Sequence, residues 1–416
     1  MSFDVWIARR LQISKGSRAG ASTGAVIAVA GVALALIVML LSIAVAVGFK
    51  DEIRRKVMGF DAPVSVLPAY NYEKATTNDF IHISDTLKKI IKESTKDAPM
   101  VVTMKRQAVL KTDSNFAAVQ CIGRDIAHDY GFEQGNIVAG KFPNFSSEAT
   151  DDSIVISSTL ANKLSLDVGD KTYLYFFVDD EVKARRMFIS GFYISDFGEY
   201  DNSIIYTRLQ RLQRLSKDSL IATSIDIENI PIEEIPAITE KLQNNLINKY
   251  KTDKISEIYP VTNVLTTGAI FFNWLELLDT NVVIIFILML CVSMFTLISS
   301  LFIIILDRIP TIGLLRAIGA SGKCISRIFV NISMRLVGTG LLIGNIVGIG
   351  LILLQNYTHL MPLNPDMYYL SYVPVDFNLF TIVILNIGFI ITSWLILILP
   401  AKLAPKIDPA RTMRYE

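Results

Sequence analysis

One stretch of the sequence, Ala317–Cys324 (AIGASGKC), has nearly the spacing of a nucleotide-binding loop, GxxxxGK followed by Ser or Thr. In such a loop, backbone N–H groups hold phosphates and the hydroxyl ligates Mg²⁺. Here Ala317 replaces the first glycine, Cys324 replaces the hydroxyl, and no soluble-domain strand precedes the stretch. We therefore expect this chain to bind neither ATP nor Mg²⁺ itself, so any energy must come from a partner.

No other pattern points to catalysis or to a metal. His82, His128 and His359 are far apart and lack cysteines or carboxylates at ligand spacing, so we predict no metal site. The cysteines, Cys121, Cys291 and Cys324, fall in segments that should not meet, so we predict no intrachain disulfide. The chain is predicted to be a non-catalytic subunit.

The composition indicates a membrane protein. Hydrophobic residues make up 51% of the chain and charged residues 19%, and the mean hydropathy is +0.43. This is too apolar for an ordinary soluble protein. Four apolar runs could each cross about 30 Å of hydrocarbon at about 1.5 Å per residue; they are residues 22–49, 281–306, 328–354 and 378–400. A net charge of +1 gives no reason to expect a nucleic-acid partner.

The polar stretch 50–280 is large enough for its own core. Strand and helix patterns alternate along it, which predicts two small α+β lobes. The predicted strands are Pro63–Leu67, Val101–Leu110, Phe116–Ile122, Ser153–Ile156, Tyr173–Val178, Lys183–Tyr193, Ile204–Tyr206, Ala222–Ile227 and Ile255–Tyr259. The predicted helices are Ser84–Glu93, Ser158–Leu164 and Ile235–Tyr250. The expected fold is therefore four transmembrane α-helices, with a large extracytoplasmic α+β domain inserted between the first and the second.

The positions of the cations predict the orientation. Lys and Arg gather in segments 1–21, 307–327 and 401–416, whereas the loop 355–377 has none. Short loops rich in Lys and Arg stay in the cytosol. We therefore predict that both termini and the hairpin 307–327 are cytosolic, and that the insert and the last loop face the other side. Segment 1–21 is predicted to be an interfacial elbow helix, with an ordinary flexible terminus as the alternative.

The hairpin 307–327 has the signals of a short helix. Pro310 can open it and Gly319 can close it. Ile312, Leu315 and Ile318 recur every three residues and form an apolar stripe. Because so short a helix is marginal alone, we expect a separate cytosolic subunit to cover the stripe. A solvated turn with chance spacing is the alternative.

Two features, one in the third span and one in the loop that follows it, each allow two interpretations. Gly340, Gly344 and Gly348 form a GxxxGxxxG row, typical of close helix packing, but the sequence does not say whether the partner helix is in the same chain. Tyrosines crowd among prolines in the loop 355–377, which indicates either an aromatic belt at the membrane interface or a lip that faces the substrate; they are Tyr357, Tyr368, Tyr369 and Tyr372.

Several stretches, in order and spacing, resemble ABC permeases related to MacB and FtsX, and within them the lipoprotein-releasing LolC/LolE permeases. They are Gly48-Phe49, GNIVAGKFPN, IVISSTLANKLSLDVGD, GLLRAIGAS, MYYLSYVPV and the ending DPARTMRYE. The resemblance covers essentially the whole chain. It implies a permease subunit in the inner (cytoplasmic) membrane of a Gram-negative-type bacterium, with the insert in the periplasm.

The resemblance also implies partners and sites. The hairpin would be a coupling helix that docks into a cytosolic ABC ATPase, through Ile312, Leu315, Arg316, Ile318, Gly319, Ala320 and Ser321. Two permease chains, identical or different, and two ATPases that bind ATP and Mg would form the complex and transmit force mechanically. The acyl chains of a lipoprotein substrate would lie between the first and second spans, against Met39, Leu40, Ile43, Ala46 and Phe49.

Two departures from the family pattern matter. Phe177–Arg186 leaves room for little more than a turn where the family has a long hook that binds a periplasmic lipoprotein chaperone, so chaperone docking stays open. Val47 stands where the pattern often has Asn. The alternatives are an FtsX-like signalling scaffold, with a cell-wall hydrolase bound to residues 50–280, and a MacB-like efflux or export motor.

Overall fold

The computed structural model describes residues 19–71, 76–77, 79–112, 115–178, 181–252, 255 and 257–402. Most of the predicted elbow 1–21 and of the tail 401–416 therefore lies outside the described residues. The chain divides into two compact units. The helical unit comprises Met1–Asp51, Trp274–Pro362 and Tyr372–Glu416, and the insert unit comprises Glu52–Asn273 and Leu363–Ser371.

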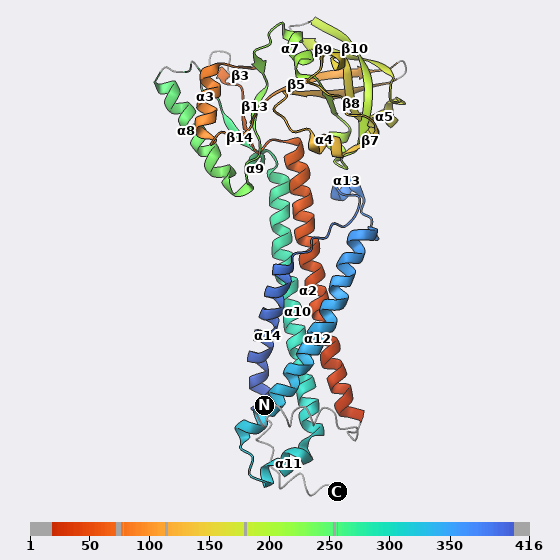
Figure 1. Cartoon of the computed structure of the whole chain (residues 1–416), viewed down its shortest axis with the longest axis vertical. Coiled ribbons are helices and arrows are strands. Elements are labelled where there is room, and N and C mark those ends of the chain that lie inside the picture. Colours follow the sequence, from red (N-terminus) through yellow and green to blue (C-terminus); the bar gives the residue numbers. More distant parts are fainter. Residues whose placement is uncertain are drawn as a thin grey trace. The chain divides into compact units, whose positions relative to one another are not determined.

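Four helices of the described chain are long and apolar enough to cross a membrane (Figure 1). They are α2 (Ala19–Phe60), α10 (Ala269–Asp307), α12 (Gly322–Thr358) and α14 (Leu379–Ala401). Both α2 and α10 extend beyond the predicted spans, because helix-favouring polar residues such as those of Lys50–Val57 continue the helix where the apolar run stops. Both α2 and α10 therefore contribute residues to both units.

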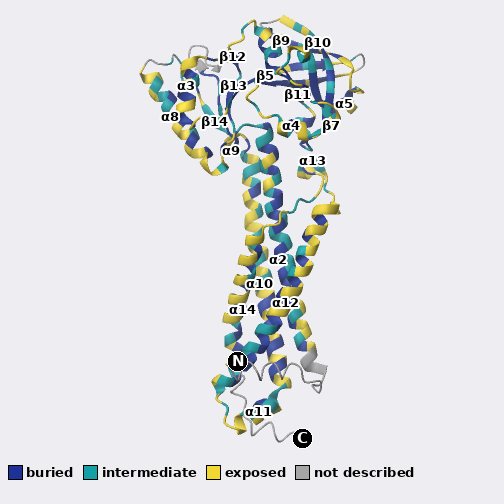
Figure 2. Ribbon diagram, viewed as in Figure 1, coloured by how far each residue is buried: buried dark blue, intermediate teal, exposed yellow. Residues whose placement is uncertain are grey.

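All four long helices contribute to a buried apolar cluster in the helical unit. Leu36 of α2, Leu297 of α10, Phe329 of α12 and Phe389 of α14 are each at most 3% exposed. Figure 2 shows the opposite faces of α10 and α14 as largely exposed, and these faces carry large apolar residues such as Phe295. Apolar outer faces are what helices need in lipid or against another helix.

The insert unit is built on a sheet of ten strands. Its strands are β1 (Val64–Val66), β5 (Met100–Lys111), β6 (Phe116–Arg124), β7 (Ile137–Gly140), β8 (Ser153–Ser157), β9 (Lys171–Val178), β10 (Glu181–Tyr193), β11 (Ile204–Thr207), β13 (Ser224–Ile227) and β14 (Val261–Asn263). Two small sheets pair β2 (Tyr70–Asn71) with β3 (Thr76–Thr77), and β4 (Ile81–His82) with β12 (Ile221–Ala222). The unit's helices between α2 and α10 are α3 (Asp85–Ser94), α4 (Gly131–Gly135), α5 (Ser158–Leu164), α6 (Gly198–Asp201), α7 (Leu209–Gln213), α8 (Ile235–Lys251) and α9 (Val264–Thr267).

Six strands of the large sheet form a closed ring. The hydrogen-bonded order is β5, β6, β11, β8, β10, β9 and again β5. Buried side chains such as Met104, Leu174 and Ile205 fill its core. Ring closure leaves these strands without a free edge. The β9–β10 pairing continues to Val178 and Glu181, so the hairpin between them is short.

The predicted two lobes share this one sheet, because β5 belongs to both parts. Its first residues pair with β13 and its last with β9. The strand predicted at Ile255–Tyr259 is wrong for its described residues, and β14 follows Pro260 instead. The Tyr259 carbonyl accepts a hydrogen bond from the Gln243 side chain at 3.3 Å rather than from a strand. The predicted strand Ala222–Ile227 is divided between β12 and β13.

Candidate functional site

The predicted hairpin contains the helix α11 (Ile309–Ala317), with Pro310 in its first turn. Gly319 follows the helix with φ +92°, a left-handed conformation that glycine adopts freely. The Ala320 N–H donates to the Leu315 carbonyl at 2.9 Å and the Gly319 N–H to the Arg316 carbonyl at 3.0 Å. This pair of bonds is a Schellman motif, which ends a helix sharply. Ser321 then caps α12 by accepting from the Cys324 N–H at 3.3 Å.

The residues of the predicted stripe do not share one free face of α11. Ile312 is 2% exposed within the bundle core, and Leu315 packs against the same core. Ile318 is 72% exposed, and so is most of Leu314, at 65%. The predicted stripe is thus split because the chain's own helices cover its first part. The predicted stripe did not include Leu314, although its spacing of four from Ile318 places both residues on one helix face.

The other predicted coupling residues have similarly mixed surroundings. Arg316, Gly319 and Ser321 are exposed, whereas Ala320 is partly buried against the bundle core. The exposed surface of this hairpin therefore combines an apolar patch, Leu314 and Ile318, with the cation of Arg316. We call Leu314 and Ile318 the free face of α11.

The glycine row of α12, at Gly340, Gly344 and Gly348, lies against α2. A Cβ atom on Gly340 would come within 2.8 Å of the Cβ of Val32, and one on Gly348 within 2.9 Å of Leu40 Cδ1. A Cβ on Gly344 would lie 3.0 Å from a backbone oxygen of α2. The partner helix that the sequence left open is therefore in the same chain.

Polar contacts join two other pairs of the long helices, α12 with α14 and α10 with α2. Asn345 of α12 and Asn386 of α14 exchange amide hydrogen bonds of 2.8 and 3.0 Å. The Ser300 hydroxyl of α10 donates to the Gly24 carbonyl of α2. In hydrocarbon such bonds have no water to compete with, so they favour a fixed helix arrangement.

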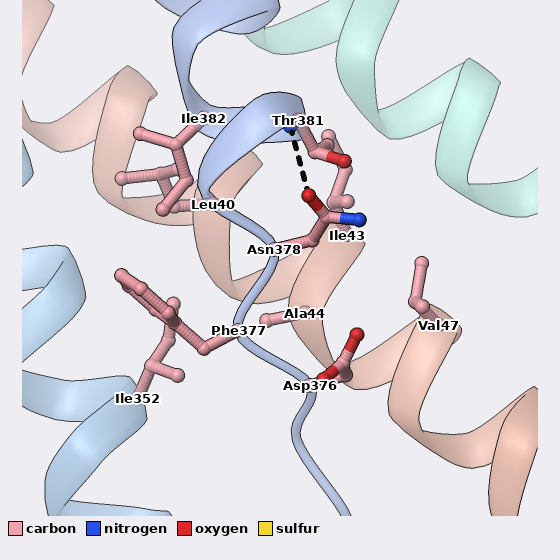
Figure 3. A pocket seen from close by; sticks show the side chains of 10 residues that line it. All are labelled: Leu40, Ile43, Ala44, Val47, Ile352, Asp376, Phe377, Asn378, Thr381 and Ile382. Carbon is pink, nitrogen blue, oxygen red and sulfur yellow. Dashed lines mark hydrogen bonds between the residues drawn. The ribbon is translucent and has the colours of Figure 1, made fainter.

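A pocket lies where α2, α12 and the start of α14 meet (Figure 3). The empty space at this pocket is about 340 Å³, a figure that includes space open to the surroundings. Most of its wall is apolar, and Asp376 and Asn378 supply polar atoms; the lining residues are Leu40, Ile43, Ala44, Val47, Ile352, Asp376, Phe377, Asn378, Thr381 and Ile382. The Asn378 side chain caps α14 by accepting from the Phe380 N–H at 3.0 Å.

The predicted lipid-contact residues do not share one site. Leu40 and Ile43 line the pocket, but its other walls come from α12 and the start of α14 and not from α10, the second of the two spans between which the acyl chain is predicted to lie. Met39 is 1% exposed and belongs to the bundle core. Ala46 is also buried, and the Phe49 ring meets the Trp274 ring of α10 edge-on at 5.3 Å.

The insert unit contains a buried charge cluster that the sequence did not reveal. The Arg124 guanidinium donates to Glu133 at 2.7 Å and to the Phe60 carbonyl at 2.7 Å. His128 lies between two carboxylates, with Nδ1 2.5 Å from Glu228 and Nε2 3.1 Å from Glu133. Arg124, His128 and Glu133 come from one short segment, but Phe60 and Glu228 are distant in the sequence, so spacing along the chain could not have predicted the whole cluster.

Family models match both parts of the chain. A model described as the MacB-like periplasmic core domain matches residues 25–244, more than half of the chain, and one described as the FtsX-like permease C-terminal matches residues 283–409. The lipoprotein-releasing system transmembrane protein LolC of Neisseria meningitidis is 23% identical and covers 100% of both chains. LolE of Haemophilus influenzae is 21% identical, over 92% of both chains. The chain belongs to the LolC/LolE-type permeases.

The family accounts for the architecture of this LolC/LolE-type permease. Four apolar helices and a MacB-like periplasmic domain between the first and second make it a multi-pass inner-membrane protein. It is an ABC transporter permease of the lipoprotein-release family. Among solved structures, the periplasmic region of MacB from Actinobacillus actinomycetemcomitans matches with a TM-score of 0.34 and 9% identity, over 50% of this chain and 92% of that one.

Proposed function

We propose that this permease extracts lipoproteins from the inner membrane, driven by ATP that a separate ATPase subunit hydrolyses. The observation that carries the proposal is similarity over the full length to permeases named for lipoprotein release. In this proposal the chain itself is non-catalytic. ATP and Mg²⁺ bind to the ATPase dimer, and a second permease chain completes the complex.

We further propose that the free face of α11 is the part that docks on the ATPase. Leu314 and Ile318 are large, apolar and exposed, at 65% and 72%. A surface of this kind, flanked by Arg316, needs a protein partner to cover it in the cytosol. The proposed orientation, with both termini and this hairpin in the cytosol, is the one that the positions of Lys and Arg favour.

For the substrate, we propose that an acyl chain of the lipoprotein contacts Leu40 and Ile43 in the pocket. The apolar wall suits a hydrocarbon chain, and Asp376 and Asn378 suit a polar end. Docking of a periplasmic chaperone has no support in the short β9–β10 hairpin.

A pull-down of the full-length permease tests the function. We expect an ABC ATPase and acylated lipoprotein to co-purify with it, and depletion of the permease to leave lipoproteins in the inner membrane. A bound cell-wall hydrolase without lipid would instead identify an FtsX-like scaffold. Dependence on an outer-membrane exit duct, with normal lipoprotein sorting, would identify a MacB-like motor.

A further inference from the structure

The loop between α12 and α14 has two parts. Leu363–Ser371, with its short helix α13 (Pro365–Tyr368), belongs to the insert unit, and the residues on either side belong to the helical unit. The two sides of the loop pair as a neck: the Leu363 N–H donates to the Ser371 carbonyl at 2.9 Å, and the Val373 N–H to the Met361 carbonyl at 3.0 Å. The chain therefore passes between the units here as well as through α2 and α10.

The base of the neck is fixed to α12. Gln355, 8% exposed, accepts from the Met361 N–H at 3.1 Å through its side-chain oxygen. Its side-chain nitrogen donates to the Val373 carbonyl at 2.9 Å. Both sides of the neck are thus hydrogen-bonded to one residue near the end of α12.

A buried lysine holds the other end of the loop. The Lys56 side chain, on the part of α2 that belongs to the insert unit, is 9% exposed. Its ammonium donates to the Ser195 carbonyl at 2.7 Å, to the Tyr369 carbonyl at 3.1 Å and to the Asp196 carboxylate at 3.2 Å. An ammonium has three donors, and here all three have acceptors. Lys56 therefore joins three segments that are distant in the sequence.

Aromatic packing reinforces this contact. The Tyr369 ring stacks on Phe197 with centroids 4.8 Å apart and meets Phe271 edge-on at 5.3 Å. The neighbouring Leu370 is 3% exposed. For the tyrosines of the loop 355–377 the sequence predicted either an aromatic belt at the membrane interface or a lip that faces the substrate. Tyr369 instead packs within the insert unit.

The backbone at the contact is strained. Asp196 has φ +61° and Tyr369 has φ +60°. A left-handed conformation is uncommon for residues other than glycine, and for a bulky residue such as Tyr it persists only where surrounding contacts hold it. The contacts of Lys56 and Phe197 are what hold it here.

We propose that Leu363–Ser371 is a latch, with Lys56 and Tyr369 as the positioning residues that fasten it to the insert unit. Fastened in this way, the loop passes a displacement of α12 to the periplasmic domain through the neck. The latch itself follows from these contacts alone. Its part in lipoprotein release rests on the proposed function.

Amide hydrogen exchange of the full-length protein tests the latch. Lys56→Met keeps the length of the side chain but removes its three bonds, and it should speed exchange in Leu363–Ser371 by roughly tenfold. Lys50→Met is the matched control, because Lys50 is on the same helix but pairs with Asp279 of the helical unit, at 2.6 Å. This control should leave exchange in the loop unchanged.

Further variants separate the latch from a loss of folding. Tyr369→Phe keeps the ring and should behave as the native protein, whereas Tyr369→Ala should resemble Lys56→Met. Asp196→Asn removes one charged acceptor while keeping a residue that tolerates a left-handed backbone, and should speed exchange less. Native exchange rates in the loop for Lys56→Met and Tyr369→Ala would overturn the proposal.

The functional arm uses the complex with its ATPase. We expect Lys56→Met to keep ATP hydrolysis and to lose lipoprotein release. A loosened loop with undiminished release would overturn the role of the latch in transmission. Failure of the proposed function is recognised separately, because the native complex would then release no lipoprotein.

Discussion

At the scale of single residues, His128 is a group of the insert unit whose surroundings change its pKa. Burial lowers its pKa, but hydrogen bonds to Glu133 and Glu228 outweigh burial and the nearby Arg124, so the pKa is raised above its ordinary value. The protonated ring can donate to both carboxylates at once. Asp125, on the same loop, has a pKa raised mainly by burial.

This shift predicts a pH-dependent stability. A histidine whose pKa is higher in the folded state contributes stability that is fully present below its unfolded pKa, 6.5, and is lost as the pH rises through the raised value. We therefore expect the melting temperature of the full chain to fall as the pH rises above about 6.5. His128→Gln should flatten this dependence, and His82→Gln, at an exposed position, should not. An unchanged slope in His128→Gln would refute this assignment.

The ion pair between Arg124 and Glu133, next to His128, leads to a second prediction about single residues. The Arg124 and Glu133 side chains are 5% and 1% exposed. Removing one partner leaves a buried charge, so Glu133→Ala should lower the free energy of unfolding by about 3–5 kcal/mol. The Lys96–Glu234 pair is exposed, at 72% and 49%, so Glu234→Ala should cost less than about 1 kcal/mol. Denaturant titration of both variants measures the difference, and equal costs would contradict it.

At the scale of elements, the contact between α2 and α12 depends on the glycine row. Gly340→Val would force side-chain atoms into α2, since its Cβ alone would lie 2.8 Å from Val32. Overpacking of this kind costs about 1–3 kcal/mol. Gly338→Val is the matched control on the same helix, where a Cβ atom meets nothing within 4 Å. Thermal unfolding in detergent should separate the two, and identical melting would mean that α2 and α12 are not in close contact.

The exposure of Leu314 on α11 leads to a prediction that differs from the one that the apolar stripe suggests, because Leu314 is not part of that stripe. Leu314→Asp puts a charge on the free face and should prevent ATPase binding while the permease remains folded. Leu315→Asp puts the charge against the bundle core instead, where Leu315 is partly buried, so it should lower the melting temperature of the permease more than Leu314→Asp does. Pull-down of the ATPase together with melting of the purified permease distinguishes the two. Normal ATPase binding by Leu314→Asp would remove the free face from the docking site.

At the scale of the whole molecule, substrate binding and ATP hydrolysis should be separable by substitution. Ile43→Trp fills the pocket and should reduce the lipoprotein that co-purifies with the complex by several-fold, while ATP hydrolysis continues. Ile27→Trp is the control, because Ile27 is on the same helix but 45% exposed and outside the pocket. Undiminished lipoprotein in Ile43→Trp would place the acyl chain elsewhere.

Much of the architecture could be predicted from the sequence because its signals are local. A run of apolar residues long enough to cross a membrane predicts a membrane helix wherever it occurs. Pro310 and Gly319 mark the ends of a helix through their own backbone preferences, and Ser84 and Ser321 cap helices that begin at the next residue. The strand predicted at Ile255–Tyr259 failed, because pairing with β1 decides which residues form a strand.

The apolar spans, the inserted α+β domain and the helical hairpin could be predicted from the sequence, because hydropathy and turn preferences act over a few neighbouring residues. Three features became visible in the folded chain alone: Ile312 is covered while Leu314 is exposed, the glycine row contacts α2, and Lys56 contacts the loop at Tyr369. Each of them depends on which distant segment supplies the neighbouring atoms, and no periodicity along the chain records that choice.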